Sequence, residues 1–260
     1  MTYSQSYRRI LHRMGYYNYQ QGLINNFLVQ EDGWLGHQKK CRNFILKALE
    51  FCKPEKITVL GSGWLMELPL VEMAERTSEI CLVDIVHPPE VISQVATVSK
   101  VRLIEEDISG GLIELVWKAA GNRTFLNKLS SLDGLTVPEY KPREDPGMVI
   151  SLNILTQIEV LPLNLLKKRS RAGESDFLLF RKSIQENHLK YLKLYNSVII
   201  TDISEIISGP GDKKEINRTL LVDLPDGISR EQWQWDSDLK GRDYNLRHSA
   251  FEVAAVILQR

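Results

Sequence analysis

Two glycines and one acid stand at a spacing that suits the binding of a nucleoside. An apolar run at 57–60 ends in Gly61-Ser62-Gly63, and a second apolar run at 80–83 ends in Asp84, about twenty residues further on. Glycines let the backbone approach a ligand at the end of a buried strand, and an acid after the next strand can accept hydrogen bonds from two ribose hydroxyls. The pattern predicts a parallel βαβ unit that holds an adenosine-type cofactor.

Four more polar side chains lie where later strands are expected to end. Asp107 follows the apolar run at 101–105, Asn153 and Gln157 stand at the end of the run that begins at 148, and Asp202 ends the run at 197–202. Ligands of a parallel sheet bind beyond the carboxyl ends of its strands. We therefore expect these side chains to face cofactor or substrate.

Aromatic residues near the start of the chain are candidates for the wall of a substrate pocket. They are Tyr16, Tyr17, Tyr19 and Trp34, and His37 is the histidine expected near the mouth of that pocket. Aromatic side chains more often belong to the core, so that interpretation stays open beside the functional one. The five histidines show no metal-ligand spacing and form no Cys–His cluster, so we predict no metal site.

Hydrophobic periodicity predicts the elements that position these residues. The fold class is α/β: a doubly wound, mostly parallel seven-stranded sheet with a C-terminal antiparallel β-hairpin and an N-terminal helical extension. Strands are expected at 56–60, 79–84, 101–105, 148–155, 197–202, 231–235 and 249–258. Helices are expected at 20–30, 35–51, 64–76, 91–98, 112–119, 125–129 and 177–195. A Gly-Pro-Gly turn is expected at 209–211, and a basic loop at 167–171.

Composition restricts the partners and the location. The 260 residues hold 33 basic and 33 acidic side chains, so no overall field concentrates polyanions, and nucleic acid is an improbable partner. No window of about 18 apolar residues and no signal-peptide core is present, which predicts a cytoplasmic protein that does not enter membranes. Three widely spaced cysteines argue against a disulfide framework.

The order of these elements resembles the class I S-adenosylmethionine-dependent methyltransferases over residues 35–260, with residues 1–34 as the helical extension and 108–147 as an embellished crossover. The first family motif corresponds to residues 60–65, and the strand-four motif to residues 151–155. The resemblance implies that the glycine loop contacts the methionine portion of S-adenosylmethionine, that Asp84 holds the ribose, and that Asp107 with Ile108 addresses the adenine. Asn153, at the end of the fourth expected strand, is a further candidate cofactor contact.

The chain departs from the family pattern at three places. Val59 stands where an acid is common, Leu65 stands where a third glycine is common, and no Asn-Pro-Pro-Tyr signature follows strand four. Methylation of exocyclic amines therefore loses support. The expected reaction is methyl transfer to a small molecule, with Tyr19, Trp34, His37, Gln157 and Asp202 as candidate substrate contacts. If the acceptor is a hydroxyl, His37 and Asp202 are candidates for its base.

Two other functions remain open. A nicotinamide-binding Rossmann oxidoreductase also uses a Gly-x-Gly turn and an acid, although Met66 stands at its third glycine position. A protein that keeps the fold for cofactor binding or interaction without catalysis would explain the departures at Val59 and Leu65.

Overall fold

The computed structural model describes residues 3–209, 214–242 and 244–260. The helices are α1 Gln5–Met14, α2 Tyr16–Val29, α3 Glu31–Cys52, α4 Leu70–Arg76, α5 Pro89–Val95, α6 Leu112–Ala120, α7 Val160–Arg169 and α8 Glu174–Leu192. The strands are β1 Lys56–Leu60, β2 Glu79–Asp84, β3 Val101–Glu105, β4 Met148–Leu152, β5 Ser197–Ser208, β6 Lys214–Arg218, β7 Ser229–Asp238 and β8 His248–Leu258.

One mixed sheet organises the chain, as the sequence predicted. Its order is β3-β2-β1-β4-β5-β8-β7, with parallel pairing from β3 to β5 and antiparallel pairing of β8 with both β5 and β7. The expected terminal hairpin is thus confirmed. An eighth strand, β6, was not expected, and it pairs with the far half of β5.

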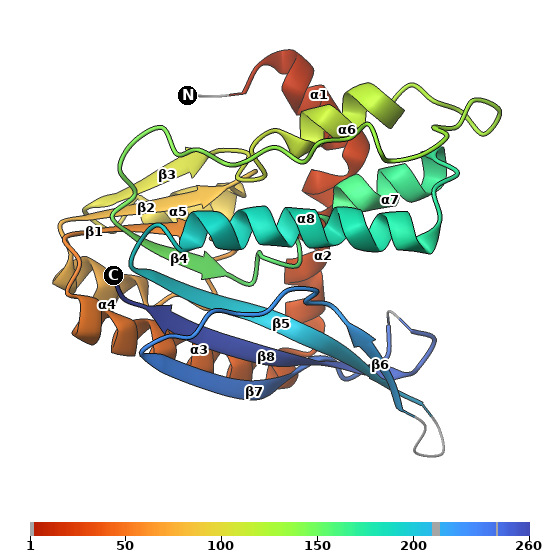
Figure 1. The fold of residues 1–260 in the computed structure, drawn as a ribbon. Coiled ribbons are helices and arrows are strands. Elements are labelled where there is room, and N and C mark those ends of the chain that lie inside the picture. Colours follow the sequence, from red (N-terminus) through yellow and green to blue (C-terminus); the bar gives the residue numbers. More distant parts are fainter. Residues whose placement is uncertain (1–2, 210–213, 243) are drawn as a thin grey trace.

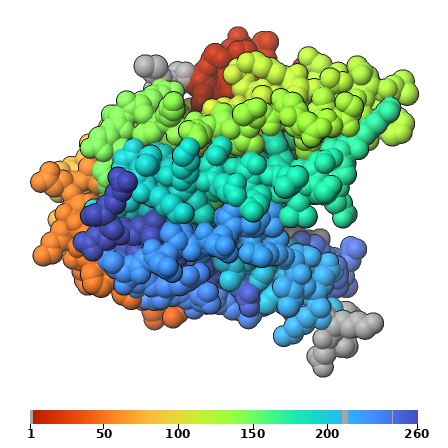
Figure 2. All heavy atoms as spheres, viewed as in Figure 1, coloured from red at the N-terminus to blue at the C-terminus, as the bar shows by residue number. Residues whose placement is uncertain are grey.

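Helices cover both faces of the sheet (Figure 1). Because successive strand residues point to opposite faces, Val59 packs with α3 and α4 in one core cluster, whereas Leu60 packs with the end of α8 in another. Burial on both faces explains why the parallel strands read as continuous apolar runs. In the space-filling view, α8 and the crossover that precedes β4 cover the facing side of the sheet (Figure 2).

The N-terminal helices join this core. Helix α1 contacts α6 and α7, and α2 contacts α3. The expected division between residues 34 and 35 falls inside α3, which runs without a break from Glu31 to Cys52 and packs along β7. The division into a helical extension and a Rossmann-like domain is therefore an interpretation of chain order, and α3 links the two parts.

Several expected boundaries were wrong. The helix expected at 64–76 begins only at Leu70, because the residues before it form turns and Leu65 takes a left-handed φ of 63°. The segment 125–129 is not helical, and Phe125 is exposed. Strand β4 ends at Leu152 because Asn153 has a φ of 50°. Most of the basic loop expected at 167–171 is the end of α7. Of the turn expected at 209–211, only residue 209 is described.

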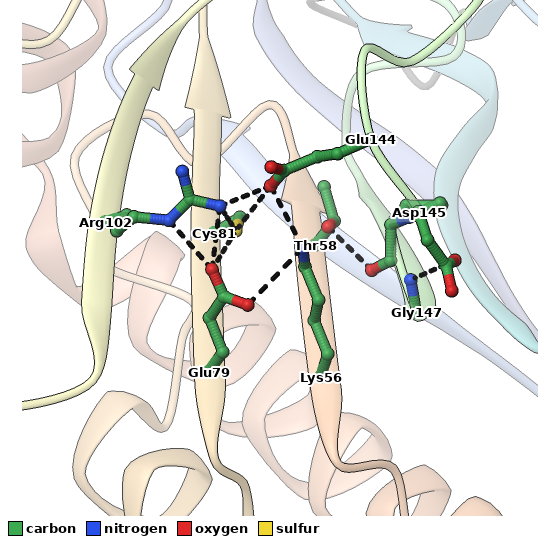
Figure 3. Close-up of polar contacts among 9 residues, drawn as sticks. Lys56, Thr58, Glu79, Cys81, Arg102, Glu144, Asp145 and Gly147 are labelled. Atoms are coloured by element: carbon green, nitrogen blue, oxygen red, sulfur yellow. Dashed lines mark hydrogen bonds and ion pairs between the residues drawn. The ribbon is translucent and has the colours of Figure 1, made fainter.

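A cluster of charged residues connects the crossover before β4 to the starts of the parallel strands (Figure 3). It lies at the end of the sheet opposite the glycine turn. Arg102 contacts both Glu79 and Glu144, and Lys56 lies 2.9 Å from Glu144 and 3.4 Å from Glu79. The ligand atoms of Glu79, Cys81 and Glu144 lie close enough together to hold a metal ion. Because Arg102 and Lys56 already compensate the charges of the two carboxylates, we interpret the cluster as an ion-pair network.

Within the described residues, no helix combines the length and apolar character needed to cross a membrane.

A buried histidine behind β4 makes the stability of the protein depend on pH. His188 Nε2 lies 2.9 Å from Ser151 Oγ, and burial lowers the pKa of His188 to about 4. Above the ordinary histidine pKa of about 6.5, the imidazole is neutral in both the folded and the unfolded chain, so its burial does not reduce the free energy of unfolding through protonation. Below that pH the unfolded chain binds a proton and the folded chain does not. This contribution to stability is full above that pH and is lost as the pH falls towards 4, by about 3 kcal/mol in all.

The buried Glu67 and Glu159, whose pKa values burial raises to about 7, act in the opposite direction over the same range. The test is therefore a comparison of variants. Denaturant titrations should show the free energies of unfolding of the wild type and His188→Gln converging by about 3 kcal/mol between about pH 7 and pH 4. The exposed His248→Gln is the control. A constant difference for His188→Gln would contradict the prediction.

Candidate functional site

The glycine turn packs directly against the end of β4. Gly61 has a φ of 77°, and its N–H donates to the carbonyl of Val83 at 3.0 Å. A Cβ placed on Gly61 would lie 2.8 Å from Ile154 Cβ and 2.9 Å from the Leu152 carbonyl oxygen. Gly63 also has a positive φ, of 51°, but the space around it is open. The first glycine is thus required by packing, and the second leaves room beside the turn.

Asp84 closes the other side of this turn. Its Oδ2 accepts a hydrogen bond from the Gly63 N–H at 2.8 Å, and its Oδ1 accepts one from the Ile85 N–H at 2.7 Å. Gln20 of α2 also donates to Oδ1, at 3.3 Å. Burial raises the pKa of Asp84, and the backbone N–H donors of Gly63 and Ile85 oppose the shift. The structure therefore places the carboxylate beside the Gly61–Gly63 bend, as the sequence predicted.

The acid after β3 has partners on the N-terminal helices and in its own loop. Asp107 Oδ2 accepts from the Tyr7 hydroxyl at 2.9 Å, and Oδ1 accepts from the N–H of Ser109 at 3.0 Å and from its hydroxyl. Burial raises the pKa of Asp107. Asp107 and Ile108 both line the cavity described next. Tyr7 and Ser109 hold the carboxylate in place there.

A cavity extends over the carboxyl ends of the strands, and we call it the glycine-turn cavity. Its empty space is about 1070 Å³ when the open mouth is included. Every residue predicted to bind cofactor lines it: Gly61, Ser62, Gly63, Asp84, Asp107, Ile108 and Asn153. The tertiary structure thus brings together residues from four strand ends.

The charged residues among the described residues that line the glycine-turn cavity are all acidic. Its acidic lining residues are Glu67, Asp84, Glu106 and Asp107. No lysine, arginine or histidine of the described chain lines it. Burial raises the pKa of Glu67 to about 7. A ligand that brings positive charge would be favoured there, and a polyanion would be repelled.

Three polar atoms of residues in the wall have no hydrogen-bond partner among the described residues. They are Ser62 Oγ, Gln20 Oε1 and Trp235 Nε1, and all three side chains are buried. A buried polar atom without a partner costs roughly 1–3 kcal/mol. A ligand with hydroxyl or amine groups would remove that cost.

A second hollow adjoins the first, and we call it the polar cavity. Tyr19, Trp34 and Gln157 line both cavities, so these three predicted substrate contacts stand between them. Asp202 lines the polar cavity alone, where it accepts a hydrogen bond from Thr156. Glu159 also lines it and forms an ion pair of 2.6 Å with Arg181.

His37 does not lie at the mouth of either cavity, so this part of the prediction was wrong. It is 1% exposed, because the ring packs on Trp235 and contacts Cys41, Asn153 and Trp233. Burial lowers the pKa of His37 to about 3. A side chain buried in this way cannot reach a substrate as its base.

Sequence reasoning missed several cavity residues. Gln20 and Leu23 of α2 and Trp235 of β7 line the glycine-turn cavity. A polar helix near the start of the chain carries no signal for contact with a strand that follows about sixty residues later. The alternation of Trp233 and Trp235 did indicate a strand, although not that Trp235 reaches α3, where its ring centroid lies 4.8 Å from that of Trp34.

No protein-family model and no curated protein matches the chain. Among solved structures, the 1,6-didemethyltoxoflavin-N1-methyltransferase of Burkholderia thailandensis is 10% identical with a TM-score of 0.39, over 98% of this chain and 91% of that chain. DhpI in its SAH complex is 8% identical with a TM-score of 0.33, over 96% and 98%. An rRNA methylase of Streptococcus thermophilus is 11% identical with a TM-score of 0.29, over 83% and 97%.

These likenesses are too distant to assign a ligand or an activity. The fold assignment rests instead on the strand order β3-β2-β1-β4-β5-β8-β7 and on the glycine turn and Asp84 at its centre. By that order, the chain has the fold of the class I methyltransferases.

Proposed function

We propose that the protein binds S-adenosylmethionine in the glycine-turn cavity and transfers its methyl group to a small molecule. The observation that carries this proposal is the charge of the cavity, which has four acidic residues in its wall and no basic residue from the described chain. S-adenosylmethionine carries a positive sulfonium and an ammonium, and these charges suit an acidic wall.

The same charge disfavours the oxidoreductase alternative. A dinucleotide cofactor brings a pyrophosphate, which is usually bound by a helix N-terminus and backbone N–H groups. Here the residues after Gly63 form turns, and α4 begins only at Leu70. The carboxylates of Glu67 and Asp84 would also repel the phosphates.

The residues of the cavity suggest how each part of the cofactor would be held. Asp84 offers two carboxylate oxygens for ribose hydroxyls, in exchange for the contact that Gln20 makes with Oδ1. Ser62 Oγ and Gln20 Oε1 are buried atoms in need of partners. Glu67, a buried carboxylate of the wall, offers a counter-charge for the ammonium that an acid at position 59 would otherwise supply.

The polar cavity is the proposed site of the methyl acceptor, because it shares Tyr19, Trp34 and Gln157 with the cofactor cavity. Methyl transfer needs the acceptor's lone pair in line with the bond between the sulfonium sulfur and the methyl carbon. The cofactor itself provides the leaving group. The task of the chain is then to align the two ligands and exclude water. Three carboxylates line the polar cavity, those of Glu159, Asp202 and Glu205, and Asp202 is the one proposed to take a proton from an acceptor.

Calorimetric titration tests this function. We expect S-adenosylmethionine and S-adenosylhomocysteine to bind with micromolar dissociation constants, and NAD to show no heat of binding. Incubation with methyl-labelled cofactor and a small-molecule extract should then give a labelled product. Binding of NAD alone would favour the oxidoreductase, and cofactor binding without any labelled product would favour a non-catalytic binder.

A further inference from the structure

A chain of hydrogen bonds links α3, β7 and the end of β4 behind the glycine-turn cavity. Trp233 Nε1 lies 3.0 Å from His37 Nδ1, and the amide nitrogen position of Asn153 lies 2.9 Å from His37 Nε2. The histidine ring stacks on Trp235, with centroids 4.3 Å apart and an angle of 13° between the planes. This stacking, together with burial, holds the imidazole in one orientation.

The contact with Trp233 decides where the imidazole carries its proton. An indole N–H can only donate, so His37 Nδ1 must accept and cannot be protonated. The same contact excludes the imidazolium, which has a proton on both nitrogens. The neutral ring therefore carries its single proton on Nε2. Cys41 Sγ, 3.4 Å from Nε2, is a weak acceptor that tolerates this proton.

The proton on Nε2 in turn decides the orientation of Asn153. An Nε2–H needs an acceptor, and an amide offers one only through its oxygen. The amide oxygen and nitrogen exchange places by a half-turn, and hydrogen-bond partners distinguish them. Oδ1 of Asn153 must therefore face His37, and the amide nitrogen must lie on the other side. Because Asn153 lines the glycine-turn cavity, its N–H groups are available to a ligand.

We propose that His37 is a positioning residue that makes Asn153 a hydrogen-bond donor towards the ligand of the glycine-turn cavity. The identity of that ligand rests on the function proposed above. For S-adenosylmethionine, the matching acceptor is the carboxylate of its amino-acid portion, because Asn153 stands between Leu152 and Ile154, which pack on Gly61. A donor at this place is also what a ligand carboxylate needs in a cavity whose charged residues are all acidic.

The substitution Asn153→Asp gives opposite results for the two orientations of the amide. It keeps an oxygen towards His37 and replaces the N–H donors with a second oxygen, and aspartate tolerates the left-handed backbone of this position. If the donor faces the ligand carboxylate, S-adenosylhomocysteine should bind at least tenfold more weakly. If instead the amide oxygen faced the ligand's ammonium, the added charge would leave binding unchanged or tighten it, and the proposal would be overturned.

Two controls accompany this calorimetric titration. 5′-Methylthioadenosine, which lacks the amino-acid portion, should bind Asn153→Asp as well as it binds the wild type. The exposed Asn122→Asp adds the same charge away from the cavity and should not change either affinity. An equal loss of both ligands by Asn153→Asp would show general damage to the site and would also overturn the proposal.

The proton on His37 is measured separately in the ligand-free protein. In ¹⁵N-labelled protein, long-range ¹H–¹⁵N spectra should show a pyridine-type Nδ1 and a pyrrole-type Nε2 for the histidine whose signals vanish in His37→Gln. His37→Gln keeps a donor that can reach Asn153, so it should retain S-adenosylhomocysteine affinity within about threefold, whereas His37→Leu should lose about tenfold. The opposite tautomer would refute the role of His37, whereas a failure of the wild type to bind either S-adenosyl ligand would refute the proposed function.

Discussion

Asp84→Asn should weaken the binding of S-adenosylmethionine by about 100-fold or more, which is the largest effect on affinity that we expect. The carboxylate accepts hydrogen bonds from Gly63, Ile85 and Gln20, so its four lone-pair sites can receive two ribose hydroxyls once Gln20 releases Oδ1. A hydrogen bond to a charged group contributes about 1.5–3 kcal/mol, and two of them account for a change of this size. Asparagine retains one acceptor oxygen and adds a donor that faces other donors. Isothermal titration of the variant with S-adenosylmethionine measures the loss.

A matched control is Asp133→Asn, which removes the same charge from an exposed loop position outside both cavities. Because Asp84 also fastens the glycine turn through Gly63, thermal unfolding of both variants should be recorded alongside the titrations. A folded Asp84→Asn protein that binds the cofactor within threefold of the wild type would remove the ribose contact from the proposed site.

Gly61→Ala should destabilise the fold strongly, and Gly63→Ala should not. The added methyl group at position 61 would lie 2.8 Å from Ile154 Cβ and 2.9 Å from the Leu152 carbonyl, in a backbone with a φ of 77°. Neither the β4 backbone nor a β-branched Cβ can move away without disturbing the sheet, so we expect a loss of about 3 kcal/mol. At position 63 the nearest atom is 4.0 Å away, so only the backbone strain of about 1 kcal/mol remains.

The two alanine variants also separate stability from binding. Chemical denaturation should rank them as wild type, Gly63→Ala and then Gly61→Ala in decreasing free energy of unfolding. Gly63→Ala should nevertheless reduce cofactor affinity, because its methyl group would stand in the space that lines the glycine-turn cavity. Equal stability of the two variants would contradict the packing of the turn against β4.

The N-terminal helices connect these predictions to the rest of the molecule. Gln20 of α2 donates to Asp84, and Tyr7 of α1 donates to Asp107, so side chains from the first twenty residues reach both acids that follow β2 and β3. Residues of α2 are part of the cavity wall, and Tyr7 of α1 holds a carboxylate of that wall in place. The sequence indicated the cofactor site by residues between 60 and 153. The N-terminal helices, which lie outside the part of the chain that resembles the family, complete that site.

The order of elements was predictable because it depends on local signals. Buried parallel strands read as short apolar runs, and Gly61, Gly63 and Asp84 punctuate two of them. The ends of elements were less predictable. Asparagine is enriched in the left-handed region, so Asn153 is an ordinary residue there, but nothing in the sequence indicates that Leu65 would take a left-handed backbone.

The positions of some functional side chains were predictable from the sequence, and those of others were not. Asn153 and Asp84 follow apolar strands, and in a parallel sheet all such positions meet at one edge, so the sequence by itself determined that they line one cavity. His37 is separated from Trp233 and Asn153 by more than a hundred residues. Only the packing of α3 against β7 buries that histidine and sets its proton, because burial and hydrogen bonding depend on neighbours in space and not in sequence.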